Sequence, residues 1–274
     1  MTASNVTEGA ARPFRVNFIG VIEQNRSQLY DNVGQNANYP LVQPAPIHDR
    51  PLAIVGGGPS LAQTVELLKD WPGDIWAINL TGKWLHERGI KSTVYSVDAS
   101  QNPFEMAPPE AVTDAIFASW CAPNVVKQYD KVRVFHMWPI VPDGIVGGTT
   151  SAVSAPLLAL KMGYKDVTFF GCESSYVDSD HVDRHEKRAE ELIVRANEKF
   201  YRTTPPFYIQ AQELSRIIKE FPQVFKEQSG GLLRGMIQDD KWEVVQVSEK
   251  LAAHFDEVNE KGIEELAKQY EGRM

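Results

Sequence analysis

The chain has 274 residues, of which 43% are hydrophobic and 23% are charged, and its formal net charge is −8 at pH 7. This composition is typical of a globular protein that has one large domain, or one domain with additions, and a sizeable core. The acidic balance argues against a general nucleic-acid binder, which needs a basic surface to displace counterions from phosphates. The net charge does not exclude a local basic pocket.

Cysteine content and hydropathy indicate the cellular setting. The two cysteines, Cys121 and Cys172, are not in C-x-x-C spacing, so neither a disulfide framework nor a zinc ribbon is indicated. The first residues lack an apolar core of signal-peptide length, and no stretch approaches the roughly eighteen apolar residues of a membrane span. We therefore expect a cytoplasmic protein with no membrane partner.

Residues 1–50 read as an N-terminal extension and connector. The segment FRVNFIGVIEQN is compatible with a short strand or helix, and the following segment, up to residue 51, is rich in Pro and Asn. Regular patterning begins near residue 51. We expect a nucleotide-binding core over residues 51–205 and a helical C-terminal segment over residues 206–274.

The chain is organised around residues 52–61, LAIVGGGPSL. The run 52–55 predicts a strand buried on both faces of a parallel sheet. The next three residues, Gly56, Gly57 and Gly58, allow positive φ and close approach of a ligand. Pro59 and Ser60 then begin a helix, with Ser60 as N-cap and a glutamine three residues later in capping-box spacing.

A strand, a glycine turn and a helix N-terminus together form a place to hold phosphate. The pattern is neither the six-residue dinucleotide fingerprint nor the P-loop, because the third glycine and the Gly-Lys-Ser/Thr are absent. A simple tight turn is the alternative interpretation.

Buried strands continue to alternate with helical segments after this loop. Strand candidates are residues 75–79, 92–98, 115–119, 132–137 and 166–171, with helical or turn segments such as 82–88, 109–114 and 151–162 between them. The alternation predicts an α/β fold with a doubly wound, mostly parallel, Rossmann-like sheet and a helical C-terminal extension. Ligands of such sheets lie at the carboxyl ends of the strands.

Polar residues close two of the predicted strands. Asn79 can bond a ribose or phosphate through its amide, and Asp98 can accept a hydroxyl or hold Mg²⁺. The alternative is that each simply starts a turn, as Asn and Asp often do after a strand.

A second glycine turn occurs at residues 147–148. It is followed by Thr150 and Ser151, whose hydroxyls are suited to a helix N-terminus that binds an anion. An ordinary β-loop-α-β unit is the alternative. Further on, Glu173 follows the strand 166–171, and Tyr176 can stack on a base or bond a phosphate.

His181 and His185 lie four residues apart, which is metal-ligand spacing on a helix. An exposed acidic loop leading into a charged helix over 183–201 is the simpler interpretation. We favour His181 as a single general base or acid. Two further helices are predicted at 210–220 and 248–271, and the apolar face of the last one indicates packing on the core or on a second copy of the chain.

These motifs together resemble the MptE-like family, which includes 6-hydroxymethylpterin diphosphokinases and motility accessory factors that transfer nonulosonic acids, and is distantly similar to family 42 sialyltransferases. The residues that carry the resemblance are GGGPSL (56–61), Asn79, Asp98, GGTTSAVSAPLLALKMGYKDVTFFG (147–171) and GCESSY (171–176). The match covers about residues 50–180.

The resemblance implies phosphate binding by residues 56–60, nucleotide contacts from Asn79, and donor contacts from Thr150, Ser151 and Tyr176. It also implies a downstream histidine as base, for which His181 is the counterpart. Two positions depart from the family pattern. Glu173 stands where the family has Asp, which would matter most at a metal site, and Gly57 stands where the family often has Asn.

Three functions remain open. The first is a glycosyltransferase that uses a nucleotide-activated sugar, most naturally a CMP-nonulosonate, and a hydroxyl acceptor, with no certain cofactor. The second is a diphosphokinase that needs ATP and Mg²⁺, with Asp98 and Glu173 as ligands. The third is a nucleotide-binding protein without catalysis. We place Asp98, Glu173 and His181 in the catalytic group.

Overall fold

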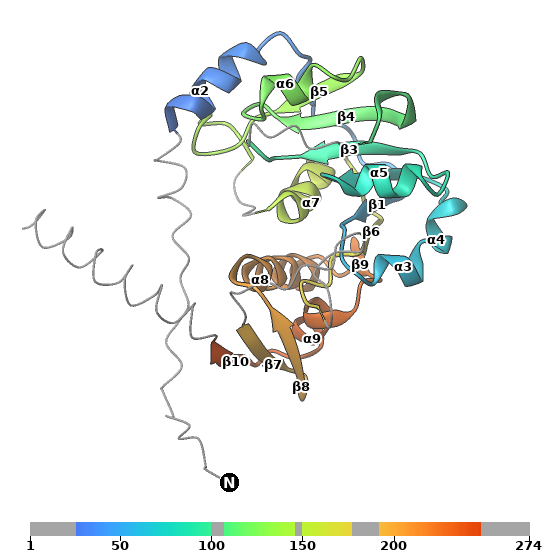
Figure 1. The fold of residues 1–274 in the computed structure, drawn as a ribbon, viewed down its shortest axis with the longest axis vertical. Helices are drawn as coiled ribbons and strands as arrows, with labels where there is room; N and C mark the ends of the chain where they lie inside the picture. The colour runs from blue at the N-terminus through green and yellow to red at the C-terminus, as the bar shows by residue number, and fades with distance from the viewer. Residues whose placement is uncertain (1–25, 100–106, 146–149, 177–191, 248–274) are drawn as a thin grey trace, which may run out of the picture.

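The computed structural model describes residues 26–99, 107–145, 150–176 and 192–247. Within these ranges, two sheets are present (Figure 1). The larger has seven strands in the order β5-β4-β3-β2-β1-β6-β9, and every adjacent pair in it is parallel. The smaller is antiparallel, in the order β10-β7-β8.

Six strands of the larger sheet are the ones predicted from the sequence. They are β1 (Leu52–Val55), β2 (Asp74–Ile78), β3 (Ser92–Ser96), β4 (Val112–Ala118), β5 (Val132–Phe135) and β6 (Val167–Phe170). The seventh, β9 (Phe225–Glu227), pairs with β6 at the edge. The doubly wound, Rossmann-like α/β class is thus confirmed.

Helices cover both faces of this sheet, and β1 shows why the chain folds in this way. All four of its residues are fully buried. Leu52 and Ile54 pack into the core on the side of α7 (Ser151–Lys161) and α8 (Pro205–Glu220). Ala53 and Val55 pack on the opposite side. A strand with two buried faces needs the continuous apolar run that the sequence shows.

Short helices cover the second face. They are α3 (Leu61–Thr64), α4 (Glu66–Lys69) and α5 (Thr81–His86). Leu61, Val65 and Leu68 are buried on one side of the α3–α4 segment. The remaining short helical segments are η1 (Pro109–Ala111) and α6 (Pro123–Val126).

The smaller sheet corrects the prediction of a charged helix over residues 183–201. Residues 192–203 instead form a hairpin of β7 (Leu192–Ala196) and β8 (Lys199–Thr203). The turn residues Asn197 and Glu198 have positive φ angles of 48° and 59°, as a type I′ turn requires. Leu192, Val194 and Ala196 are buried, so period-two burial outweighs the charge pattern.

The C-terminal extension contains the predicted helix as the longer α8, followed by α9 (Gly231–Gln238). It also contains two strands that the sequence did not indicate, β9 and β10 (Trp242–Val247). Residues of α8 and α9 form a small apolar core with the buried side of β7. The predicted helix 248–271 lies outside the described residues.

In the N-terminal extension, α2 (Arg26–Gln35) precedes an irregular connector. Asn32 and Asn36 attach α2 to the turn after β4, by donating to the carbonyls of Ser119, Trp120 and Cys121 at 2.8–3.0 Å. The predicted strand or helix over residues 14–25 lies outside the described residues.

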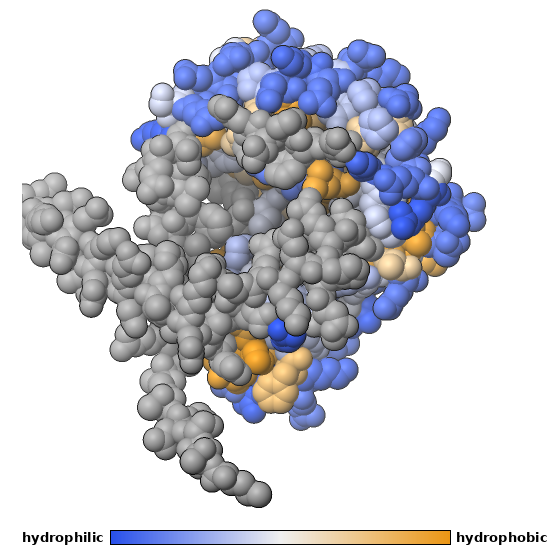
Figure 2. All heavy atoms as spheres, viewed as in Figure 1, coloured by the Kyte–Doolittle hydropathy of each residue, from blue (hydrophilic) through white to orange (hydrophobic). Residues whose placement is uncertain are grey.

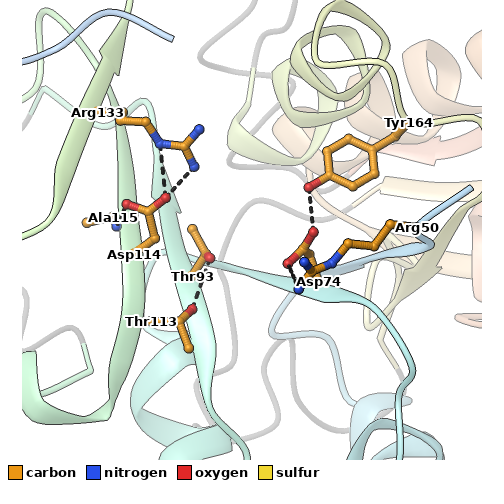
Figure 3. A network of polar contacts seen from close by, with 8 residues as sticks. All are labelled: Arg50, Asp74, Thr93, Thr113, Asp114, Ala115, Arg133 and Tyr164. Atoms are coloured by element: carbon orange, nitrogen blue, oxygen red, sulfur yellow. Dashed lines mark hydrogen bonds and ion pairs between the residues drawn. The ribbon is translucent and has the colours of Figure 1, made fainter. Parts of the chain in front are cut away.

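Polar side chains at the amino-terminal ends of β2–β5 contact one another (Figure 3). Arg50 forms an ion pair with Asp74 at 2.7 Å, and the hydroxyl of Tyr164 donates to the same carboxylate at 2.7 Å. On the neighbouring strands, Arg133 binds Asp114 through both Nε and Nη2. Asp74 and Asp114 therefore each have an arginine partner.

The visible described surface around the parallel sheet is mostly hydrophilic, with small apolar areas (Figure 2). A search of the described helices finds none with the length and apolar character needed to cross a membrane.

Candidate functional site

The strand order places the candidate site at the carboxyl ends of β1 and β6. The chain runs from β1 outward through β2 to β5 and then returns to β6 on the other side of β1. The strand order therefore reverses between β1 and β6, which makes this position a topological switch point. Loops that leave adjacent strands in opposite directions open a crevice there. The two loops are residues 56–60 after β1 and residues 171–176 after β6.

Glycines in the first loop allow close approach of chain to chain. A Cβ on Gly56 would lie 2.5 Å from the carbonyl oxygen of Gly171, and one on Gly57 would lie 3.2 Å from Oγ1 of Thr81. A Cβ on Gly58 would overlap the carboxylate of Glu173. None of the three has positive φ, so that expectation was wrong. Space, and not backbone conformation, therefore requires glycine at positions 56 and 58.

The Glu173 carboxylate occupies the position where the sequence suggested a phosphate. Its Oε1 accepts the backbone N–H of Ser60 at 2.6 Å, and its Oε2 accepts the Ser60 hydroxyl at 2.8 Å. Ser60 has helical φ and ψ angles and its side chain caps no helix, so the predicted capping box is wrong. Ser60 and Glu173 instead join the two loops, with Pro59 between Ser60 and the glycines.

Burial makes this carboxylate unusual. The side chain of Glu173 is 4% exposed. Burial raises its pKa above the ordinary value, the bonds from Ser60 oppose that rise, and the nearby Glu227 adds to it. Removal of water from a charged group is costly unless donors replace that water. The two Ser60 donors therefore hold an acid that is easier to protonate than a surface glutamate.

The N-terminus of α9 donates hydrogen bonds to the second loop, residues 171–176. The N–H of Leu233 donates to the Glu173 carbonyl at 3.0 Å, and the N–H of Leu232 donates to Oγ of Ser175 at 3.0 Å. Gly231, with φ of 58°, leaves room there, because a Cβ would lie 2.6 Å from Cβ of Glu173. Sequence reasoning missed this role, although the Gly-Gly pair before α9 was its visible signal.

Asn79 and Ser151 meet beside the first loop. Asn79 directly follows β2 and has a φ of 51°, which is uncommon for a residue other than glycine. Its Oδ1 accepts the Ser151 hydroxyl at 3.3 Å, and Oγ of Ser151 accepts the N–H of Val97 at 3.1 Å. The first turn of α7 is thereby tied to the carboxyl ends of β2 and β3.

Thr150 connects α7 to the second loop through a residue that the sequence analysis missed. Its hydroxyl donates to Oε1 of Gln210 at 2.8 Å, and Nε2 of Gln210 donates to Oγ of Ser174 at 3.0 Å. Gln210 lies on α8 and is 8% exposed. No local pattern marks it, since a glutamine on an amphipathic helix is ordinary. The predicted glycine turn 147–148 lies outside the described residues.

Tyr176 ends the second loop and is 7% exposed. Its backbone N–H donates to the carbonyl of Arg202 on β8 at 3.0 Å, and the Arg202 guanidinium lies 5.5 Å from its ring centroid. The tyrosine thus attaches the candidate site to the smaller sheet.

Asp98 and Glu173 are not brought together. Asp98 follows β3 and Glu173 follows β6, with β2 and β1 between them, so about 14 Å separates the two strand ends. The described residues contain no group of three or more His, Cys, Asp or Glu that could hold a metal ion. Both Glu173 oxygens are also engaged by Ser60. These two carboxylates do not fit a shared Mg²⁺ site. His181 and His185 lie outside the described residues.

Comparisons with known proteins give two matches. The family model described as 6-hydroxymethylpterin diphosphokinase MptE-like matches residues 27–179, more than half of the chain. Among solved structures, the chain is similar to the MAf glycosyltransferase from Magnetospirillum magneticum AMB-1, with a TM-score of 0.57 and 14% identity. That similarity covers 78% of this chain and 39% of the other, so this chain spans well under half of the other's length.

The structural similarity, at this level of identity, shows a shared fold. No curated protein matches the chain. The family model covers β1 to β6 and both loops of the switch point. On that match, the chain belongs to the MptE-like family.

Proposed function

We propose that the chain is a transferase that uses a nucleotide-activated donor, most naturally a glycosyltransferase with a CMP-nonulosonate-like donor and a hydroxyl acceptor. The observation that carries this proposal is the connected polar group at the switch point. Three sets of bonds make up this group. Ser60 bonds Glu173 and Ser151 bonds Asn79. Thr150 reaches Ser174 of the second loop through Gln210. The glycosyltransferase fold of the structural neighbour adds support.

The phosphate of the donor is assigned to the N-terminus of α7. The N–H of Ser60 already serves Glu173, so the glycine loop positions that carboxylate. By contrast, α7 is an eleven-residue helix whose N-terminal dipole points to the same edge of the sheet. Hydroxyls of Thr150 and Ser151, with the amide of Asn79, surround that end.

In the proposed reaction the acceptor oxygen attacks the anomeric carbon of the donor. The bond from that carbon to the phosphate oxygen breaks, and its electron pair leaves with the nucleotide. His181 takes the acceptor proton as general base. The helix N-terminus and Tyr176 stabilise the charge on the departing phosphate.

A diphosphokinase is the second candidate, because the family model carries that description. It would transfer diphosphate from ATP to a hydroxymethyl group, and Mg²⁺ would bridge the phosphates. Asp98 or Glu173 could supply one ligand each, but their separation argues against one ion bound by both.

A thermal-shift screen against CMP, UDP, GDP, ADP and ATP, each with and without Mg²⁺, separates these functions. Ligands that bind the folded state raise Tm by mass action. We expect a shift with CMP that does not need metal. A shift with ATP only in the presence of Mg²⁺ would favour the diphosphokinase, and no shift with any nucleotide would leave a protein without either activity.

A further inference from the structure

A second polar group lies farther along the same edge, after β4 and β5. The Oγ of Ser119, directly after β4, lies 2.9 Å from Nδ1 of His136, directly after β5. His136 is half-buried, and among the residues that the structure describes its Nε2 has no hydrogen-bond partner. One ring nitrogen is thus fixed, and the other is available to a ligand.

The turn that carries Ser119 is held from several sides. Asn36 donates to the carbonyls of Ser119 and Cys121, and Asn32 donates to that of Trp120. The indole N–H of Trp120 donates to the carbonyl of Val97 at 2.6 Å. Such support restricts the position of Ser119 and, through it, the orientation of the imidazole.

An exposed aromatic residue, Trp138, follows His136 two positions along the chain. The strand-like segment after β5 continues through Met137, which pairs with Ile145 and is 3% exposed. The His136 carbonyl accepts the N–H of Ile145 at 2.7 Å, and the N–H of Trp138 donates to the carbonyl of Ile145 at 3.0 Å. Alternation about this bridge directs the side chains of His136 and Trp138 to the side opposite Met137. Trp138 is 48% exposed, which makes it one of the exposed large apolar residues of the described chain.

The chemistry of this pair suits a ring that carries hydroxyl groups. An exposed indole face offers apolar contact to a sugar ring or a flat heterocycle. Burial, with a smaller contribution from Lys161, lowers the pKa of His136 and so favours the neutral imidazole. A neutral imidazole can exchange a hydrogen bond with a hydroxyl.

Hydrogen bonds connect the turn of Ser119 and Trp120, which holds His136, to the proposed donor site. Val97 accepts Trp120 through its carbonyl and donates to Ser151 through its N–H. Two strand spacings, about 10 Å, separate the ends of β5 and β3, and three, about 14 Å, separate the ends of β5 and β2. A molecule on Trp138 would need to extend over that distance to reach a donor at Ser151.

We propose that His136 and Trp138 form an acceptor subsite, which binds the far end of an elongated acceptor through a hydroxyl-bearing ring. The ring face lies on Trp138, and a hydroxyl that does not react bonds Nε2 of His136. This proposal rests on the proposed transferase function. It adds residues that follow β4 and β5 and that the sequence analysis did not assign to acceptor binding.

The test is saturation-transfer NMR with two probes, lactose and 6-hydroxymethylpterin, on wild type and variants. We expect binding of at least one probe, weakened about tenfold or more by Trp138→Ala and by His136→Asn. Phe200→Ala, which removes an exposed ring from β8, and His86→Asn, which changes an exposed imidazole on α5, are the controls. Ser119→Ala should weaken binding less than His136→Asn does, because it only releases the imidazole.

The two probes distinguish a sugar acceptor from a pterin acceptor. Binding that is unchanged in Trp138→Ala, or absent from the wild type with both probes, would overturn the subsite. The nucleotide thermal shift is measured on the same proteins. If probe binding is lost in the variants while the nucleotide shift is kept, the subsite is supported; if the wild type shows no nucleotide shift, the proposed function fails, and with it the assignment to an acceptor.

Discussion

Carboxylates at the amino-terminal and carboxyl-terminal ends of the parallel strands have different partners. At the amino-terminal edge, Asp74 and Asp114 each have an arginine partner (Figure 3). At the carboxyl-terminal edge, Glu173 is more deeply buried and is bonded by the N–H and hydroxyl of Ser60. The first arrangement neutralises charge and closes the edge. The second joins the two loops of the switch point, beside the proposed donor site.

Gly58→Ala should give the largest effect on stability. The new methyl group would overlap the Glu173 carboxylate and force the two loops apart. We expect a loss of about 1–3 kcal/mol in the free energy of unfolding, as for overpacking in a filled interior. Chemical denaturation measures this loss.

Gly34→Ala is the matched control, because it lies within α2 and its Cβ would meet nothing within 4 Å. It should be neutral or stabilising by up to about 1 kcal/mol, since alanine favours the helix. Equal stability of the two variants would contradict the close contact between Gly58 and Glu173.

Glu173→Gln tests the charge at the carboxyl-terminal edge through pH. Burial raises the pKa of Glu173, so the folded chain keeps a proton at a pH where the unfolded chain has lost it. The stability that this proton provides is complete below about pH 4.3, the pKa of glutamate in the unfolded chain. It is lost as pH rises through the pKa of Glu173 in the folded chain. Glutamine stays neutral and should lack this loss.

The measurement is Tm against pH for both proteins. The variant should gain stability relative to wild type as pH rises above about 4.3, the ordinary pKa of an unfolded glutamate. A difference that does not change with pH would mean that Glu173 ionises in the folded chain as it does in the unfolded chain.

Asp114→Asn at the amino-terminal edge should have the smallest effect. The ion pair with Arg133 is partly exposed, and such pairs contribute about 0–1 kcal/mol. Urea unfolding should therefore show a change of at most about 1 kcal/mol, with nucleotide binding unchanged. A loss of nucleotide binding would show that the two edges are not independent.

Local sequence signals predicted the sheet well. The apolar run of β1 and the strands after it could be located because continuous burial leaves a simple pattern. The hairpin β7–β8 was misread as a helix, because its charged side chains hid the alternation of Leu192, Val194 and Ala196.

Contacts within the site could not be predicted in the same way. Ser60 and Glu173 are 113 positions apart, and Thr150 and Gln210 are 60 apart. The sequence could indicate that each residue lies near a strand end or on a helix, but not which partner it meets. It therefore suggested a phosphate where the fold places a carboxylate of the chain itself.

Calorimetric titration tests the proposed nucleotide site directly. The nucleotide with the largest thermal shift is titrated into wild type, Ser151→Ala and Asp114→Asn. Ser151 lies at the N-terminus of α7 and bonds Asn79, so its loss should weaken the nucleotide about tenfold. Asp114→Asn should bind like the wild type. Wild-type affinity in Ser151→Ala, or equal weakening in both variants, would contradict a nucleotide site at the carboxyl-terminal edge.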